Sequence, residues 1–287
     1  MKNSELLFAA SVPLLWGFGF TFTKVGLNEF PPLFLMGLRF SMASLVLIWF
    51  VPIPRNQLKQ IFWISFVGST LRYGMTYTGL SMIDASLAII IMQLGAPFSV
   101  LLAAILFKDR PGIQSILGML ICFAGIILIS GQPSSISQLW AILLTAAGAM
   151  MWALGQVMVK RLENSPSGFA LTAWIGFFSG PQTILGSFIF EENQLESLAQ
   201  ASWIGWGVIL YGSFIMTVLG YGIWYHVLSR NPVSKVMPVM LLLPVFTIAS
   251  SMLFLGEQPS LMNFIGAAVV IGGVSLIVLT KDSKLTS

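Results

Sequence analysis

The sequence contains very little charge, one cysteine and one histidine. Charged residues make up 8% of the 287 residues, whereas soluble globular chains carry about 25%. Cys122 is the single cysteine, so the chain can form neither an intrachain disulfide nor a cysteine-based metal cluster. The phosphate-binding motif GxxxxGK[ST] is absent, which excludes that route to ATP hydrolysis. We therefore expect no catalytic residues, no cofactor and no metal site.

Apolar residues take the place of the missing charge. They make up 56% of the sequence, the mean hydropathy is +0.90, and no polar segment is long enough for a soluble catalytic domain. The net charge of +4 is small and scattered, which argues against nucleic-acid binding and fits a membrane protein. The first apolar run, 6–23, is not followed by a small-residue cleavage site, so we expect no cleavable signal peptide.

The lengths of the apolar runs predict an all-α integral membrane fold with ten transmembrane helices. A spanning helix needs about 20 mostly apolar residues, and proline is favoured in the first helical turn. Pro31-Pro32, Pro111, Pro232 and Pro259 open runs in this way. The loops are short, and the longest is 191–202. The ten runs are 5–24, 31–53, 61–80, 85–107, 111–131, 138–158, 168–190, 203–228, 232–255 and 259–280.

Basic residues predict that both termini are cytoplasmic, because cytoplasmic loops are enriched in Lys and Arg. With the N-terminus inside, Lys24 is the single basic residue at the outer side, and Arg39 and Arg72 lie within runs. A break near Gly220 in the long 203–228 run is an alternative, but it would scramble this charge bias. The cytoplasmic ends hold Lys2, Arg55, Lys59, Lys108, Arg110, Lys160, Arg161, Arg230, Lys235, Lys281 and Lys284.

Two similar stretches indicate that the chain consists of two related halves. Residues 16–24 read WGFGFTFTK and residues 152–160 read WALGQVMVK. Three matches share an offset of 136, namely Trp16 with Trp152, Gly19 with Gly155, and Lys24 with Lys160. Chance matching among a few apolar residue types is the competing explanation.

Further matches extend the repeat to the ends of the halves. Gly118 matches Gly266 and Gly125 matches Gly273 at an offset of 148, and Pro97 matches Pro244 at 147. We predict a first five-helix repeat over 1–131 and a second over 138–280. Five is an odd number, so the second half would enter from the opposite side. Inverted repeats of this kind are typical of alternating-access transporters, with the substrate path at the repeat interface.

Five motifs spread over nearly the whole chain form a family pattern. They are Trp16-Gly17 with Lys24-Val25-Gly26-Leu27, Pro31-Pro32 with Gly37-Leu38-Arg39-Phe40, residues 85–93, Gly220-Tyr221-Gly222-Ile223-Trp224, and Leu242-Leu243-Pro244-Val245. This pattern resembles the drug/metabolite transporter superfamily, within its EamA-type ten-helix group. It is most similar to the bacterial O-acetylserine/cysteine exporter branch.

The resemblance implies export of amino acids or similar metabolites across the inner membrane. It does not fix the substrate, because relatives within the group move different solutes. Two charges depart from the pattern of that branch. Arg72 stands where the branch carries a neutral polar residue, and Asp84 is an added charge at the outer end before the run 85–107.

Arg72 is the sharpest candidate for a substrate-binding residue. It lies roughly 16 Å into its run, near the middle of a hydrocarbon core about 30 Å thick. A cation at that depth needs water, a partner or a cavity, and no predicted span holds a carboxylate at similar depth. A carboxylate-bearing or zwitterionic solute would suit its guanidinium group. The alternative is a structural Arg bonded to backbone carbonyls, and we favour that structural interpretation for Arg39.

Uncharged polar and aromatic residues within the runs are further binding candidates. Amides both donate and accept hydrogen bonds, which suits a zwitterion, and aromatic rings can hold an apolar or cationic part of a solute. Ordinary helix packing is the alternative for each of them. The candidates are Gln93, Gln156, Trp16, Trp152, Tyr77 and Tyr221.

Glycines and prolines within the runs are candidates for hinges or for close packing. Such residues loosen or kink membrane helices, and the predicted hinges are Gly17, Gly19, Pro97, Gly220 and Pro244. The glycines spaced by seven in runs 111–131 and 259–280 predict a smooth packing stripe. We interpret those two helices as scaffold or as a dimer contact, so both a monomer and a homodimer stay open.

These features favour a secondary transporter that exports amino acids or related small metabolites. A multidrug exporter of the same fold is the alternative, although a positive interior disfavours cationic drugs. A membrane-embedded enzyme is less favoured, because it needs a nucleophile–base pair or a metal set at one depth. The lone His226 lies near the cytoplasmic boundary, and we do not expect it to relay protons.

Overall fold

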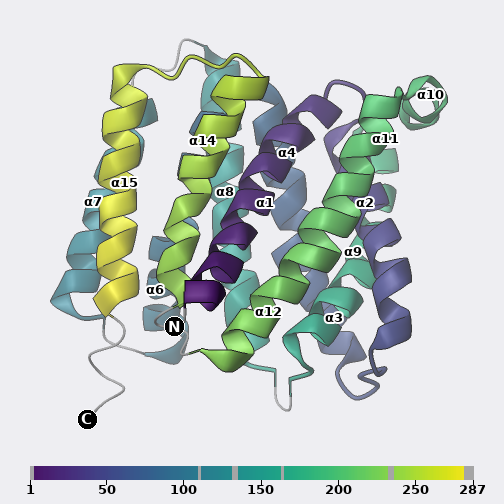
Figure 1. Cartoon of the computed structure of the whole chain (residues 1–287), viewed down its shortest axis with the longest axis horizontal. Coiled ribbons are helices and arrows are strands. Elements are labelled where there is room, and N and C mark those ends of the chain that lie inside the picture. Colours follow the sequence, from purple (N-terminus) through teal and green to yellow (C-terminus); the bar gives the residue numbers. More distant parts are fainter. Residues whose placement is uncertain (1–2, 109–110, 131–134, 163–164, 232–235, 281–287) are drawn as a thin grey trace.

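The protein is a bundle of helices that run back and forth between two ends (Figure 1). The computed structural model describes residues 3–108, 111–130, 135–162, 165–231 and 236–280, and within them the chain forms helices and no strand. The first helix begins and the last helix ends at the same end of the bundle. We call this the terminal end and the other the far end.

The elements follow the predicted runs closely. In the first half they are α1 (Asn3–Gly26), α2 (Pro32–Leu47), η1 (Ile48–Phe50), α3 (Leu58–Ser65), η2 (Phe66–Leu71), α4 (Arg72–Met82), α5 (Ala85–Met92), α6 (Gly95–Phe107) and α7 (Ile113–Ser130). In the second half they are α8 (Ile136–Lys160), α9 (Gly168–Phe190), α10 (Gln194–Gln200), α11 (Trp203–Leu210), η3 (Tyr211–Leu219), α12 (Gly220–Arg230), η4 (Met237–Leu241), α14 (Leu242–Phe254) and α15 (Leu261–Thr280).

Six helical segments of the described chain are long and apolar enough to cross a membrane, so the prediction of an all-α membrane protein is confirmed at this level. The number of ten crossings stays a prediction. The six segments are Pro32–Phe50, Ala85–Phe107, Ile136–Lys160, Trp203–Leu228, Met237–Phe254 and Leu261–Val278.

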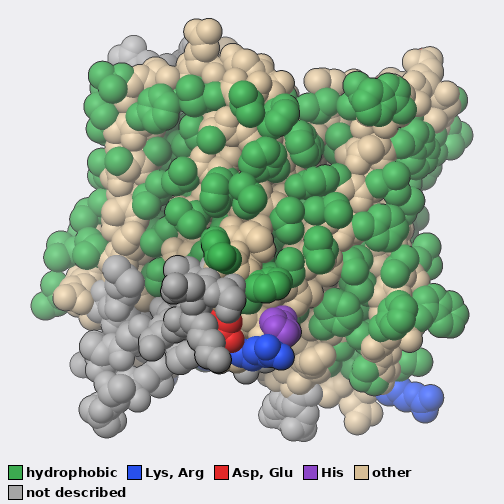
Figure 2. Space-filling view, in the orientation of Figure 1, with side chains coloured by type: hydrophobic (Ala, Val, Ile, Leu, Met, Phe, Trp, Pro, Cys, Tyr) green, Lys and Arg blue, Asp and Glu red, His purple; other side chains and the backbone are tan. Residues whose placement is uncertain are grey.

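The charged residues on the surface fit this picture. Hydrophobic side chains dominate the face in Figure 2, and the charged and histidine side chains visible there lie at the terminal end. Basic residues next to helix termini at this end are Arg55, Lys59, Lys108, Lys160, Arg161 and Arg230. Pro232 and the basic residues Lys2, Arg110, Lys235, Lys281 and Lys284 lie outside the described residues.

The structure corrects two details of the sequence interpretation. The prediction of a loop over 191–202 is wrong, because α10 forms there. The Gln194 side chain connects the first turn of α10 to the end of α9. It donates to the backbone oxygens of Ser187 and Glu191 at 2.8 Å each. The regular part of α2 ends at Leu47, earlier than the predicted 53, and one 3-10 turn follows it.

Two long helices contain a stretch of π-helix, which is rare and frequently lies at functional sites. The segment η2 joins α3 to α4, and η3 joins α11 to α12. The 203–230 segment therefore has no break at Gly220, but its geometry changes there from π to α. In a π turn the backbone hydrogen bonds span one residue more than in an α-helix. The wider turn can accommodate side chains from other helices.

A seam of small residues brings the helix 58–82 against α8. A Cβ added at Gly155 would lie 2.5 Å from the Gly68 Cα atom, so the two backbones touch. About two turns away on α8, Gly148 lies against Thr76 and the backbone oxygen of Arg72. Close approach of this kind is characteristic of small residues at membrane helix interfaces. The seam fixes Arg72 of the first half beside α8 of the second half.

The glycine stripe predicted on the last helix of each half packs within the chain. A Cβ at Gly118 or at Gly273 would lie 2.7 Å from the backbone oxygen of the other residue, and a Cβ at Gly125 would lie 2.7 Å from Val270. The stripe therefore joins α7 to α15, which fits the scaffold interpretation of these two helices.

Three glutamates close the far end by capping helices from other parts of the chain. Glu257 accepts from the backbone N–H groups of Ala85 (2.6 Å) and Ser86 (3.0 Å) at the start of α5. Glu191 accepts from two N–H groups of α2 in the same way, and Glu29 accepts from Ser202 before α11. A carboxylate at a helix N-terminus satisfies orphan donors and complements the helix dipole. Partial burial and the neighbouring Glu257 raise the pKa of Asp84.

We expect replacement of Glu257 by Ala to lower the free energy of unfolding by about 1–2 kcal/mol, because the first turn of α5 loses both caps. Thermal unfolding in detergent measures the effect. Glu196→Ala is the matched control, since among the described residues the Glu196 carboxylate accepts a hydrogen bond from Gln200, one turn along α10, and caps no other helix. Equal shifts for the two variants would contradict the capping role.

Candidate functional site

Arg72 lies at the junction between η2 and α4, partly buried against aromatic rings. Its guanidinium carbon is 4.5 Å from the centre of the Tyr73 ring and 5.8 Å from that of Trp152 on α8. Cations are attracted to the faces of such rings. The guanidinium group has no hydrogen-bond partner among the described residues. The structure therefore presents a cation that is held by rings and has free donors.

Trp152 connects Arg72 to an interruption in a neighbouring helix. A Cβ at Gly95 would lie 2.6 Å from Trp152 Cε3, so the indole ring packs directly on this backbone. Gly95 opens α6, and two residues separate it from the end of α5 at Met92. Gln93 lies in that interruption and is partly buried.

Trp16 occupies a matching place on α1. Its indole N–H donates to the backbone oxygen of Met216 at 2.9 Å, within η3. Its ring lies 5.0 Å from that of Tyr221, and a Cβ at Gly220 would lie 2.5 Å from its Nε1 atom. Each of the two repeated tryptophans thus packs where a π segment of the other half gives way to α-helix.

Arg39 on α2 is more deeply buried than Arg72, with 4% of its surface exposed. Its Nε group donates to the Gly212 oxygen at 3.1 Å, and its Nη2 group donates to Thr217 Oγ1 at 3.4 Å. Both partners belong to η3. The bond to a neighbouring helix that its structural interpretation predicts is therefore present, and it fastens α2 to the π segment.

Aromatic rings, including two tyrosines, link the two arginines. Tyr73 and Tyr77 stack at 5.5 Å, Phe40 packs on Tyr73 at 4.8 Å, and Phe20 of α1 packs on Tyr77 at 5.8 Å. Tyr73, Tyr77 and Tyr221 all lie near both guanidinium groups. We call the following seven residues the central cluster: Trp16, Arg39, Arg72, Tyr73, Tyr77, Trp152 and Tyr221.

The central cluster brings together most, but not all, of the predicted binding residues. Arg72, Trp16, Trp152, Tyr77 and Tyr221 meet there, while Gln93 lies beside the Trp152 contact. Gln156, one turn after Trp152, is exposed on α8 and contributes no contact to the cluster. Its role as a binding residue stays a prediction.

The predicted hinge residues are packing positions in this structure. The helix α1 runs unbroken through Gly17 and Gly19, and a Cβ at Gly17 would lie 2.8 Å from the Phe246 Cβ atom of α14. Pro97 and Pro244 are buried, each three positions into α6 and α14. Movement at these positions and at Gly220 stays a prediction.

The sequence did not single out Tyr73, and it favoured a structural interpretation of Arg39. Tyr73 was one residue from the chosen Arg72 and one helical turn from Tyr77, so the spacing that places Tyr73 and Tyr77 on one face could have identified it. Arg39 lies in a motif that is consistent with a structural role as well as with a role in transport. Its role depends on which of its donors find partners, and a linear sequence does not contain that information.

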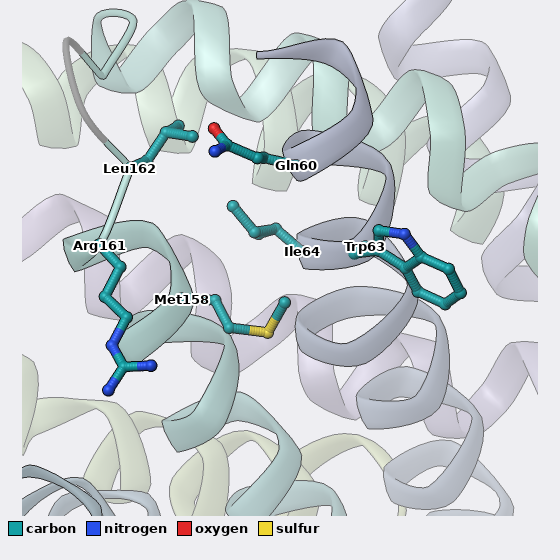
Figure 3. A pocket seen from close by; sticks show the side chains of 6 residues that line it. All are labelled: Gln60, Trp63, Ile64, Met158, Arg161 and Leu162. Atoms are coloured by element: carbon teal, nitrogen blue, oxygen red, sulfur yellow. The ribbon is translucent and has the colours of Figure 1, made fainter. Parts of the chain in front are cut away.

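A surface pocket lies apart from the central cluster, at the terminal end. It has a volume of about 230 Å³ and lies between α3 and the end of α8 (Figure 3). Ile64 and Met158 face one another across it, with Gln60 and Leu162 at one rim. The Arg161 guanidinium group is already engaged, donating to the Leu106 oxygen at 3.1 Å. The pocket contains none of the predicted binding residues.

We expect Trp152→Ala to weaken solute binding about 2- to 30-fold, because a cation–π contact is worth about 0.5–2 kcal/mol. The KM for transport measures the change. Trp140→Ala on the same helix is the matched control. This side chain is 59% exposed and lies 12 residues before Trp152. A KM that is raised equally in both variants would contradict a specific role for Trp152.

Comparison with known proteins gives matches along nearly the whole chain. A model of the EamA-like transporter family matches residues 3–131 and 139–279. A probable amino-acid metabolite efflux pump of Salmonella typhimurium is 29% identical, with 96% of this chain and 94% of the relative aligned. The protein of the same name from Escherichia coli is 28% identical over the same shares.

More distant relatives share the same extent. The uncharacterized transporter YoaV of Bacillus subtilis is 22% identical, with 96% of each chain aligned. One crystal structure matches 100% of both chains with a TM-score of 0.66 and 18% identity. At that identity the structural likeness shows the fold alone.

Proposed function

The chain belongs to the EamA-like transporter family, and from this premise we propose that it exports amino acids or related small metabolites by alternating access. The family and its bacterial relatives make it a multi-pass protein of the inner membrane, and a membrane-embedded enzyme is disfavoured accordingly. The relatives named amino-acid metabolite efflux pumps support the choice of solute class. Direction and solute are our proposal for this chain.

We propose that ten helices cross the membrane as two inverted halves, 1–131 and 138–280. Irregular stretches at corresponding positions support this arrangement. The π segments η2 and η3 end just before Arg72 and Gly220, which are separated by the same 148 residues as Gly118 and Gly266. Interrupted helices in corresponding positions of two halves are a pointer to a transporter's binding site.

The next helix of each half carries a matching irregularity. The interruption between α5 and α6 lies just before Pro97, and the 3-10 segment η4 lies just before Pro244. The gathering of basic residues at the terminal end supports cytoplasmic termini. In this arrangement, the two halves rock about a site near the middle of the membrane. The close contacts at Gly17, Gly19 and Gly220 would let α1 move against its neighbouring helices.

The observation that carries the proposal is the state of Arg72. A cation within a membrane bundle faces a partner, a cavity or water, and here it is held by two aromatic rings with unused donors. The guanidinium fork pairs well with a carboxylate. A carboxylate-bearing or zwitterionic solute would complete its interactions, with Trp16, Trp152, Tyr77 and Tyr221 as walls.

Two other functions are weaker. A multidrug exporter for lipophilic cations is disfavoured because both charges in the central cluster are positive. An enzyme would need reactive groups gathered at one depth, and no group of three metal-ligating side chains is found in the described chain. A homodimer, if it forms, would use the outer surfaces of α7 and α15, since their glycines already face each other.

Counterflow in proteoliposomes tests the proposal. Labelled amino acids, a sugar, a nucleoside and a lipophilic cation are offered to purified protein, with protein-free liposomes as the control. We expect saturable flux of at least one amino acid and none of the lipophilic cation. Saturable flux of another class without flux of any amino acid would reject the solute assignment.

A further inference from the structure

Arg39 contains the most conspicuous unsatisfied group of the central cluster. Two of its three nitrogens donate to η3, but Nη1 is fully enclosed and has no hydrogen-bond partner. Buried polar groups are almost always hydrogen-bonded, and each exception calls for an explanation. Nη1 carries two N–H groups and shares the full positive charge of the guanidinium.

A continuous set of aromatic contacts links Arg39 to Arg72. The guanidinium carbon of Arg39 is 5.5 Å from the centre of the Phe40 ring, and Phe40 packs on Tyr73. Arg72 stacks on Tyr73 as well. The stacked rings of Tyr73 and Tyr77 extend this set of contacts. The two arginines therefore belong to one site rather than to two separate ones.

The charges of this site are not balanced by the protein. Every described acidic residue lies in a loop or near a helix terminus, away from the middle of the bundle. Glu5 lies at the terminal end, and the far end holds Glu29, Asp84, Glu191, Glu192, Glu196 and Glu257. Two like charges in a low-dielectric interior repel each other, and each is costly to bury without an anion. A solute with one carboxylate would neutralise only one of them.

We propose that the transported solute carries two acidic groups, one bound by Arg72 and the other by Nη1 of Arg39. This inference rests on the proposed function, because it assumes that the central cluster is the substrate site. Acidic amino acids, dicarboxylates and phosphate monoesters of similar size share this chemistry. The Phe40 and Tyr73 rings connect the two anion-binding groups.

A neutral zwitterion satisfies Arg72 but leaves Nη1 unpaired. A hydrogen bond to a charged group is strong enough to give a preference of about 10- to 100-fold for the dianionic solute. Arg39 would then act as a specificity-determining residue, in addition to fastening α2 to η3.

The experiment compares kcat/KM in proteoliposomes for glutamate, succinate and O-phosphoserine against serine and leucine. For the wild type we expect a preference of at least about 10-fold for one of the first three over both neutral amino acids. Arg39→Gln should remove this preference, because kcat/KM for the acidic solute falls at least about 10-fold more than kcat/KM for serine. Arg39→Lys keeps the charge and should retain a preference that Arg39→Gln loses.

The outcomes separate this inference from the function on which it rests. The inference would be overturned if wild-type kcat/KM for glutamate, succinate and O-phosphoserine were all no higher than for serine. An equal loss for the acidic solute and for serine in Arg39→Gln, with no rescue by Lys, would also overturn it. If Arg39→Gln does not fold, the wild-type and Arg39→Lys preferences still decide. Transport of succinate without any amino acid would reject the proposed function and leave the two-anion inference standing.

Discussion

We expect replacement of Arg72 by Ala to reduce transport severely while leaving the bundle folded. Removing one partner of a buried, hydrogen-bonded charge pair costs about 2–5 kcal/mol, which is roughly a 30- to 5,000-fold loss of kcat/KM. Arg72 makes no hydrogen bond within the described protein, so its removal strands no other group. The melting temperature should therefore change little, and flux in proteoliposomes measures the loss.

Two further variants identify the cause of that loss. Arg72→Lys keeps the charge but loses the planar fork that binds a carboxylate bidentately, so we expect intermediate activity. Arg161→Ala removes an arginine at the terminal end, where it bonds to Leu106, and should transport normally. Unchanged kinetics of Arg72→Ala for every solute would reject its role in binding.

We expect replacement of Gly155 by Leu to disrupt both the fold and transport. Even a Cβ at this position would lie 2.5 Å from Gly68 Cα, and backbone cannot move aside as a side chain can. Overpacking of this severity costs about 3 kcal/mol or more. The displaced seam would also separate Trp152 from Arg72, so a lower melting temperature and loss of flux should appear together.

Gly207→Leu is the matched control for this prediction. It lies within α11, and nothing lies within 4 Å of a Cβ added there. The larger side chain should be tolerated, with a melting temperature equal to that of the wild type or higher, because glycine is a poor helix former. Similar destabilisation by both variants would show that bulk alone, rather than the contact with Gly68, is responsible.

The sequence predicted the helices well because membrane helices depend on long apolar runs and proline punctuation. Most of each run is helical in the described residues, and the α7–α15 glycine stripe packs as its spacing predicted. The loop prediction over 191–202 failed because α10 is short and polar, and its position depends on the Gln194 contacts with the end of α9.

The site was only partly predictable, for a physical reason. Arg72 was visible as a charge in an apolar run, and Trp16 and Trp152 were visible through the repeat. The π segments and the unpaired Nη1 of Arg39 arise from how η3 packs against α2, which no local pattern encodes. Gln156 shows the converse, since its polarity marked it as a candidate but its side chain is exposed on α8.

Equilibrium binding of a solute to wild type and Arg72→Ala tests the central claim most directly, because it separates binding from conformational change. The ligand is the radiolabelled amino acid with the highest flux in proteoliposomes, and the protein is purified in detergent with its melting temperature verified. The structure predicts saturable binding to the wild type and a Kd raised at least about 30-fold in Arg72→Ala. An unchanged Kd in a folded Arg72→Ala protein would contradict the assignment of the central cluster as the substrate site.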